Sequence, residues 1–285
     1  MTVMQMANGM GAMAARMVAD LGASVVIVDK DADGAARNAD AIKSATGRAA
    51  TVVIADLSDP AQVASAAERI RSDHAHIDVL LNNAGIFTEV YQENPAGIEL
   101  TMATNHLGGF GLTFHLLPVL QSSKARVVFV SSDAHRQAMS INFDDLNGKA
   151  AWKGKSRVPN AGFAQYNVSK LFVASGAIEL AERTADSGMT VNTIAPGALI
   201  PTGIYDDASG PIKVLVKRFP FLLRQPEKAM ITYLYVMTSP ELQGVTGWYF
   251  KDGRPIHASQ LAEASSTREQ VWQWTQTHAG VAVSI

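Results

Sequence analysis

The chain has 285 residues, of which 47% are hydrophobic and 18% charged, so it can bury a large core and is not a disordered chain. A formal net charge of −2 excludes the basic surface of a nucleic-acid binder. The absence of cysteine excludes disulfides, thiolate metal sites and cysteine nucleophiles. No apolar run approaches the ~18 residues of a membrane span, and the N-terminus does not resemble a signal peptide. We therefore expect a cytoplasmic protein with no membrane span.

Short β-branched runs alternate with alanine-rich helical stretches along the chain. The predicted strands are Ser24–Val28, Ala50–Ile54, Val79–Leu81, Arg126–Val130 and Thr190–Ile194. The predicted helices are Gly11–Leu21, Asp33–Thr46, Pro60–Asp73, Ala96–Leu120 and Ala164–Ala185. Strands that are apolar on both faces and separated by helices predict an α/β fold, a Rossmann-type doubly wound parallel sheet. Because no linker or repeat divides the chain, we expect one domain over residues 1–285.

A glycine-rich turn precedes the first predicted helix. Asn8, Gly9, Met10 and Gly11 fit the start of G-x-G-x-x-A, and Asp29 follows twenty residues after Gly9. Such a turn lets backbone N–H groups and a helix N-terminus face a pyrophosphate. Asp29 would then accept hydrogen bonds from the ribose of adenosine.

The segment before this turn is short. Only residues 1–7 are available for a first strand, and three of them are methionines, which are poor strand formers. We therefore expect a shortened first strand that supports the turn weakly.

Two long segments and a C-terminal extension interrupt the alternation. Residues 133–162 are rich in polar residues, and residues 197–226 contain four prolines and an apolar run around Phe219–Leu223. The second segment is predicted to be a substrate loop or lid, with plain core and a membrane-surface contact as alternatives. Residues 246–285 form the extension. The histidines, including His135, lack a clustered carboxylate or cysteine, so we expect no metal site.

Polar residues follow several predicted strands. Tyr166 and Lys170 lie four residues apart and share one face of a helix, where an ammonium group would stabilise a phenolate. Ser131 and Ser132 end one strand, Asn82 to Gly85 end the strand before it, and Asn105 lies in the helix between. Each residue alone is typical of a turn or a cap. Their joint order predicts a site at the carboxyl edge of the sheet.

These residues make the sequence similar to the short-chain dehydrogenase/reductase family over nearly the whole chain. The segments that carry the resemblance are GMGAMAARMVADLGA, ADLSD, LLNNAG, TNHLGGF, VVFVSSDAH, YNVSK and VNTIAPG. Within the family, NFDDLNG and the C-terminal GWYFKDGRPIHAS resemble the retinol-dehydrogenase-like branch.

The resemblance implies a role for each matching residue. Tyr166 would be the general acid/base, Ser132 would bind the carbonyl oxygen, Lys170 would hold the nicotinamide ribose and lower the pKa of Tyr166, and Asn105 would anchor a water in a proton relay. The implied cofactor-binding residues are Asn8, Gly9, Met10, Gly11, Asp29, Lys30, Asp56, Leu57, Asn83, Ala84, Gly85, Tyr166, Lys170, Pro196 and Gly197.

The sequence departs from the family pattern at two places. Met4 and Gln5 stand where the family has Thr-Gly, and Pro201 stands where a threonine usually follows the Pro-Gly pair. Gln5 and the short first strand weigh against dinucleotide binding. They leave open an alternative in which the protein carries out non-redox chemistry (isomerisation, dehydration or cyclisation) or only binds a ligand.

The resemblance favours an NAD(P)-dependent oxidoreductase that interconverts an apolar alcohol and a ketone or aldehyde. Asp29 disfavours a 2′-phosphate by charge repulsion whereas Lys30 attracts one, and we expect NAD over NADP. The predicted helix after Tyr166 carries the small residues Ala174, Ser175, Gly176, Ala177 and Ala181. Because small residues permit close packing, and because this helix commonly joins subunits in the family, we expect a homodimer or homotetramer.

Overall fold

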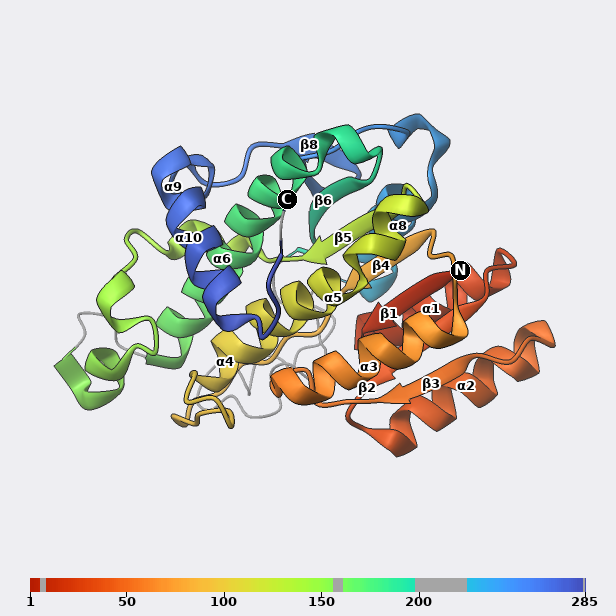
Figure 1. Ribbon diagram of the computed structural model, residues 1–285, viewed down its shortest axis with the longest axis horizontal. Helices are drawn as coiled ribbons and strands as arrows, with labels where there is room; N and C mark the ends of the chain where they lie inside the picture. The colour runs from red at the N-terminus through yellow and green to blue at the C-terminus, as the bar shows by residue number, and fades with distance from the viewer. Residues whose placement is uncertain (6–8, 156–160, 198–224, 284) are drawn as a thin grey trace.

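The computed structural model describes residues 1–5, 9–155, 161–197, 225–283 and 285 of the chain. An eight-stranded sheet forms its centre, with the strand order β3-β2-β1-β4-β5-β6-β7-β8 (Figure 1). All neighbouring strands are parallel except β7 and β8, which are antiparallel. The strands are β1 Thr2–Gln5, β2 Val25–Asp29, β3 Thr51–Ile54, β4 Val79–Asn82, β5 Arg126–Val130, β6 Thr190–Ala195, β7 Tyr249–Lys251 and β8 Arg254–Ile256.

The order of the strands reverses at β1, since β2 and β3 lie on one side of it and β4 and β5 on the other. At such a reversal the two crossover connections leave in opposite directions, and a crevice opens beyond the carboxyl ends of the strands. The first strand is as short as predicted, with four residues, yet it is central and pairs with both β2 and β4. Its apolar neighbours on both sides keep it in the sheet.

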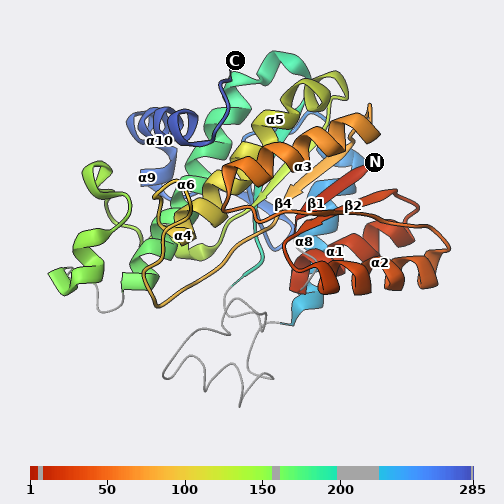
Figure 2. The ribbon, with the colours of Figure 1, turned by 60° about the horizontal axis from the view of Figure 1, so that its bottom comes forward.

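Helices cover both faces of the sheet (Figure 2). On one face lie α1 Gly9–Asp20, α2 Ala32–Thr46 and α8 Pro226–Thr238. On the other lie α3 Pro60–Asp73, α5 Gly109–Ser122 and α6 Ala161–Arg183, and α10 Ser265–His278 packs on α6. Two buried apolar clusters fill the layers, one on each face of the sheet. The predicted α/β fold, a single doubly wound sheet, is confirmed.

Local signals placed several element ends correctly. The helix α3 begins at Pro60, as predicted, because the Asp59 side chain accepts a hydrogen bond from the N–H of Ala61. The long helix predicted from residue 96 begins instead at Leu100, where the carboxylate of Glu99 accepts a hydrogen bond from the N–H of Met102. No strand or helix was predicted between the segment 197–226 and residue 246, where the structure has α8.

None of the helices in the described part of the chain is both long and apolar enough to cross a membrane. Among the same residues, no group of three or more His, Cys, Asp or Glu side chains is arranged to hold a metal ion.

Candidate active site

Gln5 joins the carboxyl ends of β1 and β4 at the strand reversal. Its side chain is 1% exposed. Nε2 donates to Oδ1 of Asn82 at 2.6 Å, and Oε1 accepts from the backbone N–H of Ala84 at 3.3 Å. A glycine at this position makes neither bond. The expectation that the short strand supports the turn weakly therefore overlooked this link, which is made by the residue that departs from the family pattern.

The helix α1 begins at Gly9, which has a φ of 59°. This left-handed conformation is accessible to glycine without a steric cost. Gly11 is buried one turn into the helix, and Met10 lies at its start beside the hydroxyl of Tyr233. The N-terminus of a twelve-residue helix at the carboxyl edge of β1 is the arrangement that binds a pyrophosphate. Asn8 lies outside the described residues.

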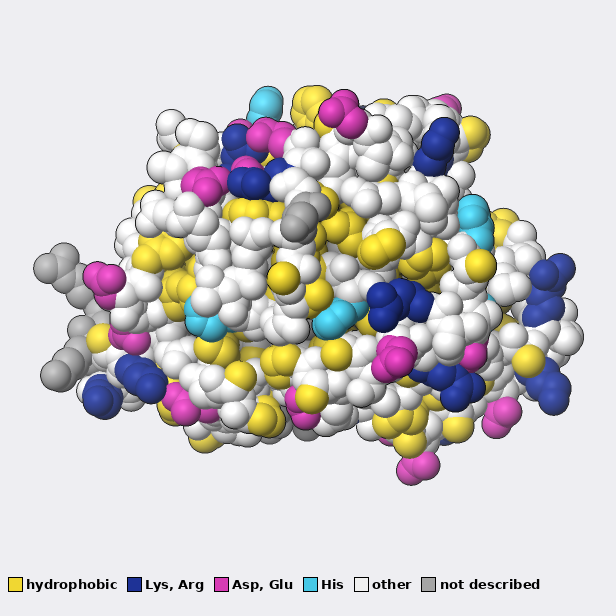
Figure 3. Space-filling model, viewed as in Figure 1, with side chains coloured by type: hydrophobic (Ala, Val, Ile, Leu, Met, Phe, Trp, Pro, Cys, Tyr) yellow, Lys and Arg dark blue, Asp and Glu magenta, His cyan; other side chains and the backbone are white. Residues whose placement is uncertain are grey.

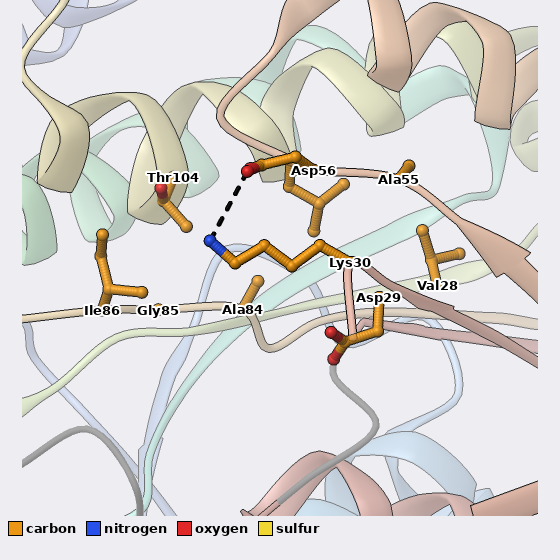
Figure 4. Close-up of a pocket in the computed structure, with 10 residues that line it drawn as sticks. Val28, Asp29, Lys30, Ala55, Asp56, Ala84, Gly85, Ile86 and Thr104 are labelled. Atoms are coloured by element: carbon orange, nitrogen blue, oxygen red, sulfur yellow. Dashed lines mark ion pairs between the residues drawn. The ribbon is translucent and has the colours of Figure 1, made fainter. Parts of the chain in front are cut away.

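A pocket with an empty volume of about 420 Å³ opens beyond the ends of β2 and β3. We call it the strand-edge pocket. Its lining residues are Val28, Asp29, Lys30, Ala55, Asp56, Leu57, Ala84, Gly85, Ile86 and Thr104. Lys30 extends across it toward Asp56, with an Nζ to Oδ2 distance of 3.5 Å, while the Asp29 carboxylate points the other way (Figure 4). The pocket thus combines apolar walls with three charged side chains.

Hydrogen bonds hold both carboxylates of the pocket. Burial opposes the ionisation of Asp56, but the N–H and hydroxyl of Ser58 donate to it and Lys30 lies close. Together these contacts hold the pKa of the Asp56 carboxyl below its usual value. Asp29 accepts from the N–H of Asp31 at 2.8 Å. These hydrogen bonds fix the direction of both side chains, and the Asp56 carboxylate is ionised at neutral pH.

The segment that follows β4 is fixed by contacts on either side of the sheet. Asn82 donates to the hydroxyl of Thr113 at 2.9 Å, in addition to its bond with Gln5. Asn83 accepts from the hydroxyl of Tyr233 on α8 at 2.9 Å, and burial raises the pKa of that phenol. These contacts leave the backbone from Ala84 onward to line the strand-edge pocket.

Asn105 lies in a six-residue π-helix, η1 Ala103–Gly108, between α4 Leu100–Met102 and α5. A π segment inside a helix commonly marks a functional site. The side chain pairs with both backbone groups of Ile86, accepting from its N–H at 2.7 Å and donating to its carbonyl at 3.0 Å. It also donates to the hydroxyl of Ser169 at 3.0 Å. Asn105 therefore fastens the segment after β4 to the helix that carries Tyr166 and Lys170.

Lys170 is 2% exposed, and burial lowers the pKa of its ammonium group from 10.5 to about 8. Its Nζ donates to the carbonyl of Val130 at 3.0 Å and lies 5.7 Å from the ring centroid of Tyr166. A Cβ on residue 85 would lie only 3.1 Å from this nitrogen and 3.5 Å from Oδ1 of Asn105. Gly85 is therefore where three of the predicted segments meet, and a side chain there would crowd all of them.

The two serines after β5 have different surroundings. Ser131 is buried, and its hydroxyl donates to the carbonyl of Lys170 at 2.8 Å. Ser132 is part-exposed, and its hydroxyl oxygen accepts from the N–H of Ala134 at 3.2 Å, which leaves its hydrogen to be donated elsewhere. Of the two hydroxyls, therefore, only that of Ser132 keeps a hydrogen that no protein group within the described residues accepts.

The last predicted residues follow β6. Pro196 is buried, and Gly197 has a φ of 104°, which favours glycine. The expected lid over 197–226 lies almost wholly outside the described residues, as does Pro201.

Sequence reasoning missed two side chains that support the site. Tyr233 lies on a helix that was not predicted, and its contact with Asn83 spans 150 residues. His135 was considered only as a metal ligand, although it is 0% exposed and hydrogen-bonded to the backbone of Ser132. Its position three residues after the predicted catalytic serine was the available signal.

The fold and this site define a dinucleotide-binding α/β protein, and comparison with known proteins gives the family. A family profile described as short chain dehydrogenase matches residues 1–143. The chain is 33% identical to human retinol dehydrogenase 14 over 232 residues, covering 79% of this chain and 66% of that one. It is 31% identical to mouse retinol dehydrogenase 12, and the match covers 93% of this chain and 81% of the relative. The chain belongs to the short-chain dehydrogenase family, and it resembles the retinol-dehydrogenase-like branch.

A solved structure has the same architecture and a bound dinucleotide. RhlG of Pseudomonas aeruginosa, in an active-site complex with NADP, superposes with a TM-score of 0.67 at 25% identity, covering 87% of this chain and 93% of that one. The chain spans about two thirds of the length of retinol dehydrogenase 14.

Proposed function

We propose that the protein is an NAD(P)-dependent oxidoreductase that interconverts an apolar alcohol and a ketone or aldehyde. One observation carries the proposal: Asn105, Lys170 and the backbone at Gly85 meet beside the strand-edge pocket, with Tyr166 next to Lys170. A nicotinamide dinucleotide fits these residues. Gly85 has no side chain and so leaves room for a ribose, the acidic strand-edge pocket suits the adenosine, and the helix N-terminus at Gly9 suits the pyrophosphate. When bound, it would supply or accept the hydride.

The side chains would handle the proton and the substrate oxygen. In reduction, Tyr166 would give its phenolic proton to the carbonyl oxygen, while the Ser132 hydroxyl donates a hydrogen bond to that oxygen and stabilises developing charge. Lys170, an ammonium group at neutral pH, would stabilise the phenolate left behind. Lys170 would also hold the ribose hydroxyls, and Asn105 would anchor a water for reprotonation. In oxidation each proton moves the other way.

Aromatic side chains next to Tyr166 favour an apolar substrate. The rings of Phe87 and Phe163 lie 4.6 Å apart, and Phe87 meets the Tyr166 ring edge-on at 6.2 Å. Phe87 is 4% exposed and therefore forms a fixed apolar wall. The names of the retinol dehydrogenase relatives agree with this, and retinol and retinaldehyde belong in the panel of substrates tested.

The charges of the strand-edge pocket favour NAD. Lys30 is paired with Asp56, and Asp29 adds a second carboxylate, so the three groups carry one net negative charge. A 2′-phosphate would be repelled by this charge. The complex of RhlG with NADP argues the other way, since it shows that the same fold takes the phosphorylated cofactor.

Calorimetric titration with NADH and NADPH tests the proposal, followed by turnover of apolar ketones and aldehydes. We expect NADH to bind more tightly than NADPH, and the Asp29→Ala variant to show a smaller difference between the two affinities. Tyr166→Phe should abolish turnover while dinucleotide binding persists. If neither dinucleotide binds, the redox assignment fails. The second candidate, non-redox chemistry or ligand binding, then follows, and the observation that favours it is the side chain of Gln5 in place of a glycine.

A further inference from the structure

The turn that carries Ser132 is attached to the C-terminal extension by several side chains. This turn is η2, Asp133–Gln137, and it faces β7 and the segment before α9 Gln260–Glu263. Asp133 pairs with Lys251 at 2.9 Å. The guanidinium of Arg136 donates to the carbonyls of His257 and Ala258. Residues about 120 positions apart in sequence are thereby held together beside the proposed catalytic serine.

His135 is the buried centre of this attachment. Its Nε2 lies 3.0 Å from the backbone N–H of Ser259, and because an N–H can only donate, Nε2 must be the acceptor. The ring hydrogen is therefore on Nδ1, which lies 2.7 Å from the carbonyl of Ser132 and 3.3 Å from the hydroxyl of Tyr249. The His135 ring also packs on the Tyr249 ring, with centroids 4.8 Å apart. Both ring nitrogens are thus engaged, and only the neutral ring satisfies them.

We propose that His135 is a positioning residue for the reaction, which holds Ser132 at the substrate oxygen and is itself held by the C-terminal extension. The inference rests on the proposed function. Three hydrogen bonds hold Ser132 within one turn. Its carbonyl accepts from Nδ1 of His135 and from the backbone N–H of His135 at 3.1 Å, and its hydroxyl oxygen accepts from the N–H of Ala134. Loss of the Nδ1 contact leaves this carbonyl held only by the backbone N–H of His135, which allows the Ser132 backbone to shift. The direction of its hydroxyl then changes.

Burial, more than the charges around it, keeps the His135 ring neutral. Burial lowers its pKa, and Arg136 opposes a second positive charge, whereas the Ser132 carbonyl, Asp133 and Glu263 favour protonation. Tyr249 faces the ring without a charge, and Lys251 is paired with Asp133. A proton on Nε2 would make this nitrogen a donor, so that it could no longer accept the hydrogen bond from the N–H of Ser259. Acid would therefore break the attachment at Ser259.

Three variants test the role in turnover. His135→Phe keeps the ring volume and removes both hydrogen bonds, His135→Asn restores a donor at the place of Nδ1, and His76→Phe changes an exposed histidine far from the site. We expect His135→Phe to lower kcat by about tenfold to a hundredfold, because small misplacements of reacting groups cost that much. The dissociation constant of the dinucleotide should stay unchanged. His135→Asn should recover most of the loss, and His76→Phe should match the parent protein.

The outcomes separate this inference from the proposed function. If the parent protein turns over substrate and His135→Phe does so equally well, the role of His135 is disproved and the function stands. Equal losses in His135→Phe and His135→Asn, or a parallel loss of dinucleotide affinity, would show a merely structural role. If the parent protein has no dinucleotide-dependent turnover, both proposals fail.

Nitrogen NMR gives a readout that does not depend on turnover. The ¹⁵N shifts of the His135 ring should show the Nδ1–H tautomer at pH 7 and no charge. A charged ring or the Nε2–H tautomer at that pH would overturn the inference, since Nε2 would then no longer accept from Ser259.

Discussion

Gln5 shows how one residue can replace a family feature by another kind of contact. The family has glycine at this position, whereas here a buried amide satisfies the carbonyl oxygen of the Asn82 side chain and the N–H of Ala84. A buried polar group that loses its partner costs more than the bond itself contributed. The stability of the sheet at its reversal point therefore depends on this side chain.

Replacing Gln5 by Leu tests that dependence. The variant replaces the amide with an apolar side chain of similar size and leaves Asn82 and Ala84 each without one partner. We expect the free energy of unfolding to fall by about 2–4 kcal/mol, from a cost of about 1–2 kcal/mol for each unpaired group. Urea denaturation measures it. Thr51→Ala, at a part-exposed position on the outermost strand β3, provides the comparison. A loss in Gln5→Leu no larger than in that variant would contradict the role assigned to Gln5.

Lys170 is placed for chemistry at the expense of stability. Its pKa is about 8 in the folded protein against 10.5 in the unfolded chain. At pH 7 the folded state must carry a charge that burial disfavours, so the lysine destabilises the protein by about 3 kcal/mol. This penalty is complete below pH 8 and disappears as the pH rises through 10.5.

We therefore expect Lys170→Met to be more stable and inactive. The substitution removes the penalty but leaves the carbonyl of Val130 without its donor, which costs about 1 kcal/mol. A net gain of about 1–2 kcal/mol in the free energy of unfolding should remain at pH 7, measured by urea denaturation without dinucleotide. The gain should vanish near pH 10. A variant less stable than the parent at pH 7 would show that the ammonium group is better solvated than its burial indicates.

At the scale of elements, the π-helix η1 contacts two different parts of the molecule through adjacent residues. Asn105 points to the segment after β4, while the next residue, His106, points to α10. His106 is 0% exposed, and its Nε2 lies 2.7 Å from the hydroxyl of Thr275, which donates to the carbonyl of Val271. Since that hydroxyl has used its hydrogen, His106 must donate from Nε2. Its Nδ1 is buried without a hydrogen-bond partner among the described residues, so a second proton there would be unsatisfied and the ring stays neutral.

The neutral state of His106 makes the packing of α10 sensitive to acid. Burial lowers the pKa of His106 from 6.5 to about 3. Between these values the unfolded chain binds a proton that the folded protein does not, so stability falls by about 1.4 kcal/mol per pH unit as the pH drops. In His106→Gln, the free energy of unfolding should fall less steeply as the pH drops, by the contribution of one proton. Urea denaturation from pH 7 to 4 measures this slope. An unchanged slope would mean that His106 is charged in the folded protein.

At the scale of the whole molecule, α10 covers the surface expected to join subunits. The small residues of α6 are buried within the single chain, and a Cβ at Gly176 would lie 2.8 Å from the Phe110 ring. Trp272 of α10 packs on Phe114, and Trp274 packs on Phe172. The small residues therefore serve packing inside one chain, and the expected homodimer or homotetramer loses the support that they gave it.

The outer side of α10 is polar. The exposed residues on it include Glu269, Gln270, Gln273 and Thr277. Figure 3 shows the same face of the molecule, where apolar side chains are interspersed with uncharged polar groups and with charged side chains of both signs. A helix that is apolar inside and polar outside acts as a cover for the α5 and α6 surface.

Removing residues 265–285 should therefore promote self-association. The truncation exposes the aromatic rings of Phe114 and Phe172, and apolar surface of this kind drives association. Light scattering after gel filtration should show a higher molar mass or aggregation for the truncated chain. The full-length control Gln273→Lys, altered on the exposed side, should keep the mass of the parent protein. A truncated chain that stays folded with that same mass would contradict the covering role.

The sequence by itself determined the alternation of strands and helices as far as β6, the sheet type and the polar residues expected at its carboxyl edge. Apolar runs and capping residues act over a few positions, so β5 and α3 have the predicted bounds. Asn105 and Lys170, predicted on two helices, meet beside Gly85 at the end of β4, and Tyr166 lies next to Lys170. The strand-edge pocket followed from the same reasoning, since parallel strands end at one edge.

Only the tertiary structure decided which distant side chains meet there. Gln5 reaches Asn82 across 77 residues, and His135 reaches Ser259 across 124. The strand β8 and the covering helix α10 likewise acquire their places only against a finished sheet. Contacts between residues so far apart in sequence depend on the strand order and on the path of the loops. The composition of a short segment does not determine which other segment will face it.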